Sequence, residues 1–248
     1  MTPPRVVGAA AYPPTVSEPT AAAAGREPAV ADDRRSGPGL FVVFEGGEGA
    51  GKSTQLARLA TSLRRAGGEV VCTREPGGTP AAEAIRGLLL DPATGGLDSR
   101  AEALLFAAAR ADHVARVVRP ALQRDAIVLC DRYVDSSVAY QGRGRGLGVA
   151  AVAQLSRWAT EELHPDLTVL LDIDPAAGLR RARSAAGPDR LEAEEMAFHD
   201  RVAQAFRDLA AADPGRYLVL DARAPADQVA AAIASRVEAS LAAKRLPQ

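Results

Sequence analysis

The sequence predicts an α/β protein built on a parallel sheet of about five strands with helices on both faces. Short, nearly continuous apolar runs rich in β-branched residues and leucine alternate with longer stretches of helical periodicity. Such runs are typical of strands that are covered on both faces. Their alternation with helices indicates βαβ units joined by right-handed crossovers. No internal repeat interrupts this pattern.

The first 38 residues differ from the rest of the 248-residue chain. Residues 1–38 are rich in Pro, Ala, Gly and charge, and they show no periodicity. Such a segment buries too little apolar surface to offset the entropy of ordering, so we expect a disordered tail. It also lacks the apolar stretch of a secretory signal peptide. The folded domain is therefore expected at residues 39–248.

The expected elements follow in order along this domain. The strands, each a short apolar run, are Leu40–Phe44, Val70–Cys72, Ile127–Cys130, Leu167–Leu171 and Tyr217–Leu220. The helices, each a longer run with helical spacing, are Gly51–Ala66, Ser99–Arg119, Val149–Leu163, Pro175–Arg183, Leu191–Ala211 and Pro225–Lys244. Gly67 and Gly68 stop the first helix, and Pro120 is expected to stop the second.

Composition excludes several classes of protein. Hydrophobic residues make up 47% and charged residues 25%, as in ordinary globular proteins. A net charge of -1 argues against a general nucleic-acid binder, and no apolar run reaches the roughly 18 residues of a membrane span. Cys72 and Cys130 are too few and too distant for a disulfide framework or a zinc site. We expect both cysteines to be small buried side chains of a protein in the reducing cytoplasm. For the whole protein, we expect neither a nucleic-acid partner nor a membrane partner.

A glycine-rich loop follows the first expected strand and fits the pattern G-x-x-x-x-G-K-[ST]. Glycines let backbone N–H groups converge on phosphate oxygens, and the helix that follows directs its positive end at the anion. Lys52 is expected to reach the β- and γ-phosphates of ATP, and the Ser53 hydroxyl to ligate Mg²⁺. The expected nucleotide-binding residues are Gly46, Gly47, Glu48, Gly49, Ala50, Gly51, Lys52, Ser53 and Thr54.

A second acidic ligand is expected beside the metal. Asp131 follows the third expected strand, whereas Asp172 and Asp174 follow the fourth. Asp131 is the first candidate, but the sequence leaves the choice between Asp131 and Asp172 open. Asp174 precedes Pro175 and also suits a helix N-cap. The sequence lacks the N-K-x-D or T-K-x-D element that reads guanine, which argues against a switch GTPase.

Further polar segments are expected at the carboxyl ends of strands, where ligands collect in doubly wound folds. Arg74 follows the second strand and Arg132 the third, and each offers a rigid fork for a phosphate. Phe106 and Arg110 are four residues apart and so share a helix face, as a stacking platform beside a hydrogen-bond donor. Alone, each arginine would suit a solvated surface. Together they favour phosphoryl transfer from ATP to a nucleoside monophosphate.

Several segments in register resemble bacterial thymidylate kinases, which are P-loop nucleoside monophosphate kinases. They read F-E-G-G-E-G-A-G-K-S-T, T-R-E-P-G-G-T, L-F-A-A-A-R, D-R-Y-V-D-S-S-V-A-Y-Q-G, P-D-L-T-V-L-L-D-I-D-P, R-R-A-R and D-R-L-E. The resemblance extends from Leu40 to about Lys244. It implies a P-loop NTPase-type fold, transfer from ATP to dTMP with Mg²⁺ in dTTP synthesis, and a homodimer.

The resemblance also implies individual roles at the acceptor site. Arg74 and Arg132 would bind the dTMP phosphate, Phe106 would stack on thymine, and Arg110 would bond to a thymine carbonyl. The remaining pocket residues would be Ser137, Tyr140 and Gln141 around base and sugar, with Glu48 near the sugar 3′-hydroxyl. The peptide bond before Pro76 would be cis.

A mobile arginine-rich lid at about residues 180–192 is implied by the same resemblance. Gly49 stands where some thymidylate kinases carry an arginine, and members without it place one in the lid. Arg183 is the first candidate for stabilising the transferring phosphoryl group, and Arg190 is the second. Some bacterial relatives have a further lid arginine near Ala185 that this chain lacks. The expected catalytic residues are therefore Lys52, Arg132 and Arg183.

Three competing functions remain open from the sequence. One is a P-loop kinase for a different monophosphate or a nucleoside, against which the T-R-E-P-G-G and D-R-Y-V-D-S-S segments argue. Another is a nucleotide-dependent switch or scaffold for a protein partner, which the missing guanine element disfavours. The last is an inactive kinase domain, which the intact Lys52, Ser53, Arg74 and Arg132 disfavour.

Overall fold

The computed structural model of the chain describes residues 39–183 and 189–245, without the side chains of Arg183 and Arg245. The tail expected at residues 1–38 lies outside the described residues, as does the middle of the expected lid. In the described ranges, no helix combines the length and the apolar character needed to cross a membrane.

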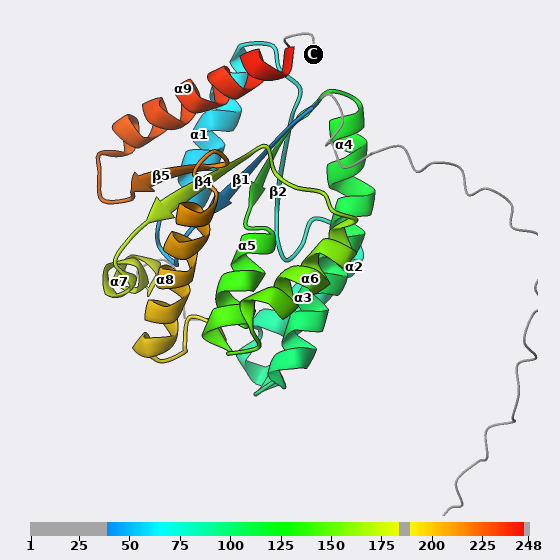
Figure 1. Ribbon diagram of the computed structural model, residues 1–248, viewed down its shortest axis with the longest axis vertical. Coiled ribbons are helices and arrows are strands. Elements are labelled where there is room, and N and C mark those ends of the chain that lie inside the picture. Colours follow the sequence, from blue (N-terminus) through cyan, green and yellow to red (C-terminus); the bar gives the residue numbers. More distant parts are fainter. Residues whose placement is uncertain (1–38, 184–188, 246–248) are drawn as a thin grey trace, which may run out of the picture. The chain divides into compact units, whose positions relative to one another are not determined.

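Five parallel strands form one sheet in the order β2-β3-β1-β4-β5, which confirms the predicted fold class (Figure 1). They are β1 Leu40–Glu45, β2 Val70–Arg74, β3 Ile127–Asp131, β4 Leu167–Asp172 and β5 Tyr217–Asp221. From the central β1 the chain first builds the β2–β3 side and later the β4–β5 side. β1 therefore lies where the strand order reverses, and open α/β sheets bind ligands at the carboxyl ends of the strands there.

Helices cover both faces of the sheet. They are α1 Lys52–Arg65, α2 Pro80–Leu90, α3 Ser99–His113, α4 Arg119–Gln123, α5 Val134–Ser137, α6 Val149–Thr160, α7 Pro175–Arg183, α8 Met196–Ala212 and α9 Ala226–Arg245. α1 and α9 lie on one face, and α4 and α8 lie on the opposite one (Figure 1).

The core follows from the alternation of side chains along β1, all of whose residues are buried. Val42 and Phe44 pack in the cluster that includes residues of α1 and α9. Phe41 and Val43 point to the other face and pack in a cluster that includes Leu122 of α4. Successive residues of a strand face opposite sides, so one apolar run fills two cores. This fixes the end of β1, from which the phosphate loop begins.

Some predictions about the elements were wrong. α2 was not expected, although Thr79 caps it by accepting a hydrogen bond from the Ala82 N–H at 3.1 Å. α8 begins at Met196, whereas a helix from Leu191 was expected. Pro120 does not end the second helix: after a π-helical turn the chain continues into α4, because proline in a first helical turn needs no N–H partner.

The two edge strands are less buried than the sequence predicted. β2 and β5 each have one neighbouring strand, and from Val71 and Leu218 onwards their side chains alternate between partly buried and exposed positions. Cys72 on β2 is therefore exposed, contrary to expectation, whereas Cys130 on the interior strand β3 is buried as predicted. The strand order, which the sequence does not reveal, decides this difference.

Candidate functional site

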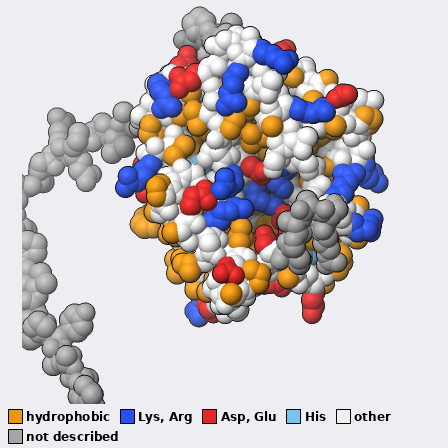
Figure 2. Space-filling model, turned by 180° about the vertical axis from the view of Figure 1, so that it is seen from behind, with side chains coloured by type: hydrophobic (Ala, Val, Ile, Leu, Met, Phe, Trp, Pro, Cys, Tyr) orange, Lys and Arg blue, Asp and Glu red, His pale blue; other side chains and the backbone are white. Residues whose placement is uncertain are grey.

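A cavity of about 500 Å³ opens at the carboxyl ends of β1, β2 and β3. It is lined by residues 48–54 of the phosphate loop and, from the expected acceptor set, by Arg74, Phe106, Arg110, Arg132, Ser137, Tyr140 and Gln141. Figure 2 shows Lys and Arg side chains gathered near the middle of one face of the domain. The structure thus brings the expected donor and acceptor residues to the same cavity.

The phosphate loop packs closely against the start of α7. Gly49 has a φ of 65°, and a Cβ there would lie 2.1 Å from the carbonyl oxygen of Gly178. Gly178 is equally constrained, because a Cβ on it would lie 2.3 Å from the carbonyl oxygen of Glu48. Backbone therefore meets backbone where the loop touches α7. A side chain at Gly49, including the arginine of some relatives, would require the two segments to separate.

Lys52 begins α1 and lies folded over the phosphate loop. Its Nζ donates to the carbonyl oxygens of Gly46 at 3.0 Å and Gly47 at 2.9 Å, and its side chain is buried. Burial and the nearby Arg132 lower the pKa of Lys52, while Glu48 and Asp131 oppose that change. The ammonium group is thus held at the loop by carbonyl oxygens and by surrounding carboxylates.

Asp131 and Ser53 lie together, whereas Asp172 is engaged elsewhere. The Ser53 hydroxyl donates to Asp131 Oδ2 at 2.8 Å. Asp172 forms an ion pair with Arg207 of α8 at 3.1 Å, and Asp174 caps α7 by accepting from the Ala177 N–H at 2.9 Å. Among the described residues, no three His, Cys, Asp or Glu side chains form a metal cluster. A Mg²⁺ ion here would therefore need phosphate and water oxygens as further ligands.

Arg132, Glu48 and Tyr140 form a compact group beside the loop. Arg132 Nη2 donates to Glu48 Oε1 at 2.5 Å, and the Tyr140 hydroxyl donates to the same oxygen at 2.7 Å. The guanidinium also lies over the Tyr140 ring, 5.1 Å from its centroid. Burial raises the pKa of Glu48, but Arg132 and Lys52 outweigh it and lower that pKa to about 2. Glu48 is therefore a carboxylate at neutral pH.

Arg74 at the end of β2 also lines the cavity. Its Nη2 donates to both carboxylate oxygens of Glu83 at 3.0 Å, and its side chain is half exposed. The Glu75–Pro76 peptide bond is cis, as the resemblance implied. Arg86, which was not predicted because α2 was not expected, lines the same cavity and donates to the Pro76 carbonyl at 2.9 Å.

Phe106 and Arg110 face the cavity together from α3. Arg110 is buried and donates to Glu75 Oε2 at 2.7 Å and to the Ser137 hydroxyl at 2.8 Å. Ser137 ends α5, and the following π-helical turn carries Tyr140 and Gln141. Such turns are common at functional sites because they redirect side chains. No role was predicted for Glu75, whose partner lies 35 residues further along the chain.

A family model described as thymidylate kinase matches residues 44–233. The chain belongs to the thymidylate kinase family. The matched range contains the phosphate loop, every acceptor residue named above, and the strands β2 to β5.

Individual thymidylate kinases are similar over most of the chain. The enzyme of Deinococcus radiodurans is 55% identical over 195 residues, covering 79% of this chain and 94% of that protein. The enzyme of Clavibacter michiganensis subsp. michiganensis is 54% identical over 206 residues, covering 83% and 97%. The crystal structure of thymidylate kinase from Ehrlichia chaffeensis aligns with a TM-score of 0.67 at 33% identity, covering 80% of this chain and 98% of that one.

The arginines of the segment expected to form a lid differ in their surroundings. Arg181 on α7 lines the cavity. Arg183 is the last residue of α7, and its side chain lies outside the described set, so its catalytic role stays a prediction. Arg190 donates to Glu102 Oε2 at 2.6 Å and to the Leu89 carbonyl at 2.8 Å, in a mostly buried position on α2 and α3.

Proposed function

We propose that this protein transfers the γ-phosphoryl group of ATP to dTMP, giving ADP and dTDP for dTTP synthesis. The observation that carries the proposal is the shared cavity, which is lined both by the phosphate loop and by Phe106 and a group of arginines. Membership of the thymidylate kinase family supports the same substrates. Family membership does not support the competing functions, which are a kinase for a different monophosphate, a nucleotide-dependent switch and an inactive kinase domain.

On the donor side, Lys52 would contact the β- and γ-phosphates, and the backbone N–H groups of the loop would bind the remaining oxygens. Ser53 and Asp131 fit a Mg²⁺ ion, because a hydroxyl and a carboxylate oxygen lie 2.8 Å apart beside the loop. Mg²⁺ would supply charge neutralisation of the phosphate oxygens. Two protein ligands are typical of a magnesium site completed by substrate phosphates.

On the acceptor side, Arg74 and Arg132 would bind the dTMP phosphate. Arg74 would exchange its exposed ion pair with Glu83 for this phosphate, which costs little because exposed pairs are weak. Phe106 would stack on thymine, and Arg110 would donate to a thymine carbonyl. The base and sugar pocket would be completed by Ser137, Tyr140 and Gln141, with Glu48 at the sugar 3′-hydroxyl.

The reaction needs little covalent chemistry from the protein. A phosphate oxygen of dTMP forms a bond to the γ-phosphorus as the bond to the ADP oxygen breaks, in line with it. The rate would come from holding two anions at attacking distance and from cations that match the charge of the transition state. Lys52, Arg132 and Arg183 are the cations proposed for this role.

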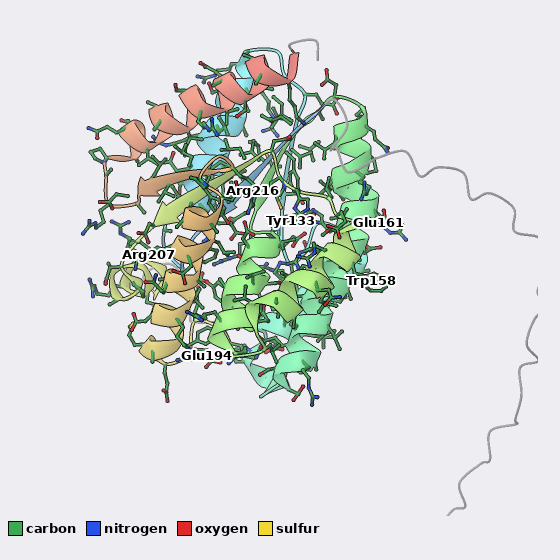
Figure 3. All side chains as sticks on the ribbon, in the orientation of Figure 1. Tyr133, Trp158, Glu161, Glu194, Arg207 and Arg216 are labelled. Atoms are coloured by element: carbon green, nitrogen blue, oxygen red, sulfur yellow. The ribbon has the colours of Figure 1, made fainter. Side chains whose placement is uncertain are left out.

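A homodimer is the proposed assembly. Leu104 on α3 and Trp158 on α6 are 58% and 81% exposed, and these two helices pack against each other. Figure 3 shows Trp158 at the outer side of α6. A second copy of the chain would cover these side chains. Sedimentation velocity should give a dimer for the wild type and a weaker dimer for Trp158→Glu; a wild-type monomer at micromolar concentration would contradict the proposal.

The reaction is tested by measuring ADP release from ATP and Mg²⁺ with a panel of acceptors. The panel contains dTMP, dUMP, dCMP, dGMP, AMP and thymidine. We expect a strong preference for dTMP and loss of activity when Mg²⁺ is chelated. Preference for another monophosphate would overturn the assignment of the base pocket. ATP binding without transfer to any acceptor would instead favour a nucleotide-dependent switch or an inactive kinase.

A further inference from the structure

Two buried carboxylates hold side chains of the cavity: Glu75 is itself among the lining residues, whereas Glu102 lies outside that lining. Glu75 follows β2 and is 4% exposed, and Glu102 in the first turn of α3 is fully buried. Each contacts one side chain that lines the cavity: Glu75 contacts Arg110, and Glu102 contacts Gln141. Buried carboxylates are costly unless they are paired and hydrogen-bonded, so each position requires an explanation.

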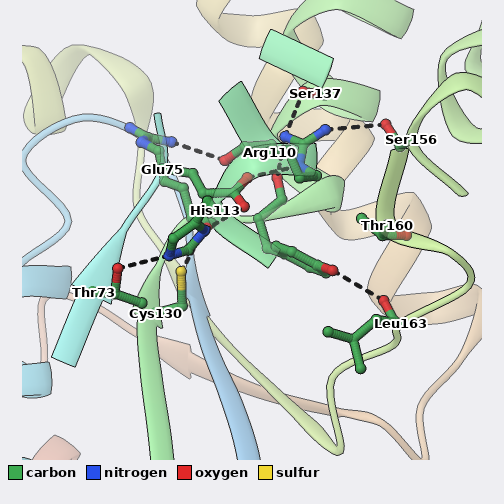
Figure 4. Close-up of polar contacts among 12 residues, drawn as sticks. Thr73, Glu75, Arg110, His113, Cys130, Ser137, Ser156, Thr160 and Leu163 are labelled. Carbon is green, nitrogen blue, oxygen red and sulfur yellow. Dashed lines mark hydrogen bonds and ion pairs between the residues drawn. The ribbon is translucent and has the colours of Figure 1, made fainter. Parts of the chain in front are cut away.

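Glu75 holds the guanidinium group of Arg110 in place (Figure 4). Arg110 Nε donates to Glu75 Oε2 at 2.7 Å. Nη1 donates to the Ser156 hydroxyl at 3.2 Å, and Nη2 donates to the Tyr133 carbonyl at 3.2 Å and the Ser137 hydroxyl at 2.8 Å. These bonds engage four of the five guanidinium N–H groups. The remaining Nη1–H is left to donate to a ligand in the cavity that Arg110 lines.

The second oxygen of Glu75 is held as well. His113 Nδ1 lies 3.0 Å from Glu75 Oε1, and His113 Nε2 lies 2.7 Å from the Thr73 hydroxyl (Figure 4). Burial raises the pKa of Glu75, but Arg110 and His113 outweigh it and lower that pKa. The carboxylate is therefore ionised and held from both sides, so neither it nor Arg110 is free to rotate.

Glu102 fixes the amide of Gln141 in one of its two orientations. Gln141 Nε2 lies 2.9 Å from Glu102 Oε1. Arg145 and Arg190 donate to the same carboxylate at distances between 2.6 and 3.2 Å, and their hydrogen bonds contribute to lowering the pKa of Glu102 against the effect of burial. An ionised carboxylate only accepts hydrogen bonds, so the amide nitrogen must face it. Oε1 is then the atom that Gln141 presents to the cavity.

We propose that Glu75 and Glu102 are positioning residues that fix a donor on Arg110 and an acceptor on Gln141, and thereby select thymine. Thymine offers a carbonyl acceptor at C4 and an N–H donor at N3. Cytosine offers the reverse, an amino donor at C4 and an unprotonated acceptor at N3. The donor on Arg110 and the acceptor on Gln141 therefore match the C4 carbonyl and the N3 N–H of thymine. On cytosine they would meet a second donor and a second acceptor. This inference rests on the proposed function, since it concerns the base of the same acceptor.

The test compares dTMP with 5-methyl-dCMP as acceptors for wild type, Glu75→Gln and Glu102→Gln. The two acceptors differ only at the edge that these residues would read. In Glu102→Gln the new amide can pair with Gln141 in either orientation, so Gln141 is free to turn its Nε2 towards the base. We expect the preference for dTMP, as a ratio of kcat/KM values, to fall by about tenfold or more in each variant. The KM for ATP should stay near that of the wild type.

Glu194→Gln is the matched control. Glu194 pairs with Arg145 at 2.6 Å in the same cluster as Glu102 but has no bond to Gln141. This variant should retain the wild-type preference for dTMP. A general loosening of the cluster would lower the preference in the control as well, and that result would overturn the proposal.

Circular dichroism identifies any variant that does not fold. In that case Glu75→Asp and Glu102→Asp replace the Gln variants, because they keep the buried charge and only withdraw it from its partner. An unchanged acceptor ratio in folded variants, with a wild type that strongly prefers dTMP, would overturn the positioning role. A wild type that does not phosphorylate dTMP would instead overturn the proposed function itself.

Discussion

The donor and acceptor sides of the cavity are built in different ways. On the donor side, the contacts of Lys52 reach Gly46 and Gly47, six and five residues away in the chain. On the acceptor side, the contacts join residues that are 35 positions apart for Glu75 and Arg110, and 84 apart for Arg132 and Glu48. The Lys52 contacts on the donor side are therefore local to the phosphate loop, although Ser53 on the same side reaches Asp131, 78 positions away. The acceptor contacts exist only in the folded domain. A substitution at Lys52 on the donor side should therefore lower activity without lowering stability. A substitution on the acceptor side should lower both.

The largest expected effect is that of Lys52→Ala on the donor side. Lys52 bonds to carbonyl oxygens of its own loop, so its removal should leave the fold intact. Loss of a charge-stabilising group of this kind lowers turnover by roughly 10²- to 10⁵-fold. Steady-state ADP release with saturating ATP and dTMP measures the loss, and circular dichroism checks the fold.

Arg65→Ala is a suitable control for Lys52→Ala. It removes the same charge from an exposed position at the other end of α1. Turnover of this control should equal that of the wild type. Near-normal turnover of Lys52→Ala would contradict the mechanism, and unfolding of that variant would contradict the local character of the Lys52 contacts.

Phe106→Ala should show the opposite behaviour on the acceptor side. Phe106 lines the cavity and also packs in the cluster around α8, so its truncation should lower the free energy of unfolding by about 3–5 kcal/mol. It should also raise the KM for dTMP much more than the KM for ATP. Val202→Ala removes apolar volume from the same cluster but not from the cavity wall, so it should leave both KM values unchanged. Equal changes of both KM values in Phe106→Ala would remove Phe106 from the base site.

The difference between local and long-range contacts also explains which features could be predicted from the sequence. The five strands and the phosphate loop were predictable because apolar periodicity and the glycine pattern are local signals. All the expected acceptor residues line the cavity, but their roles stay predictions. Glu75, Glu102 and His113 were not predicted, since a buried carboxylate or imidazole has no signature until its distant partner is known. Cys72 was placed wrongly for a related reason: the exposure of β2 depends on strand order, a property of the whole sheet.

The backbone contact between the phosphate loop and α7 is tested by Gly49→Ala and Gly51→Ala. Both glycines have positive φ values, 65° and 90°, so both variants carry backbone strain of about 1–2 kcal/mol. Only at Gly49 would the new Cβ meet backbone, 2.1 Å from the Gly178 oxygen, whereas nothing lies within 4 Å at Gly51. Overpacking should cost Gly49→Ala about 1–3 kcal/mol more in unfolding experiments. Equal losses of unfolding free energy in the two variants would show that the phosphate loop and α7 can move apart at little cost.

Glu45, which ends β1, should make the stability of the domain depend on pH. Glu45 Oε1 accepts from the Tyr133 N–H at 2.9 Å and the Ser136 N–H at 3.1 Å. Burial, together with the nearby Asp135, raises the pKa of Glu45 from 4.5 to about 7. The folded state therefore holds a proton that the unfolded chain has lost, and stability falls as the pH rises from 4.5 to 7.

Glu45→Gln should remove this pH dependence, because a neutral amide fits the same hydrogen bonds. Glu48 does not obscure the measurement: its pKa is lowered to about 2, so the stability it contributes is complete above pH 4.5 and is lost only towards pH 2. Across pH 4.5–7, the wild type should lose about 3 kcal/mol at most relative to Glu45→Gln. Urea unfolding of both proteins through this range measures the difference. Parallel curves would mean that Glu45 keeps an ordinary pKa, and the end of β1 would then tolerate a charge.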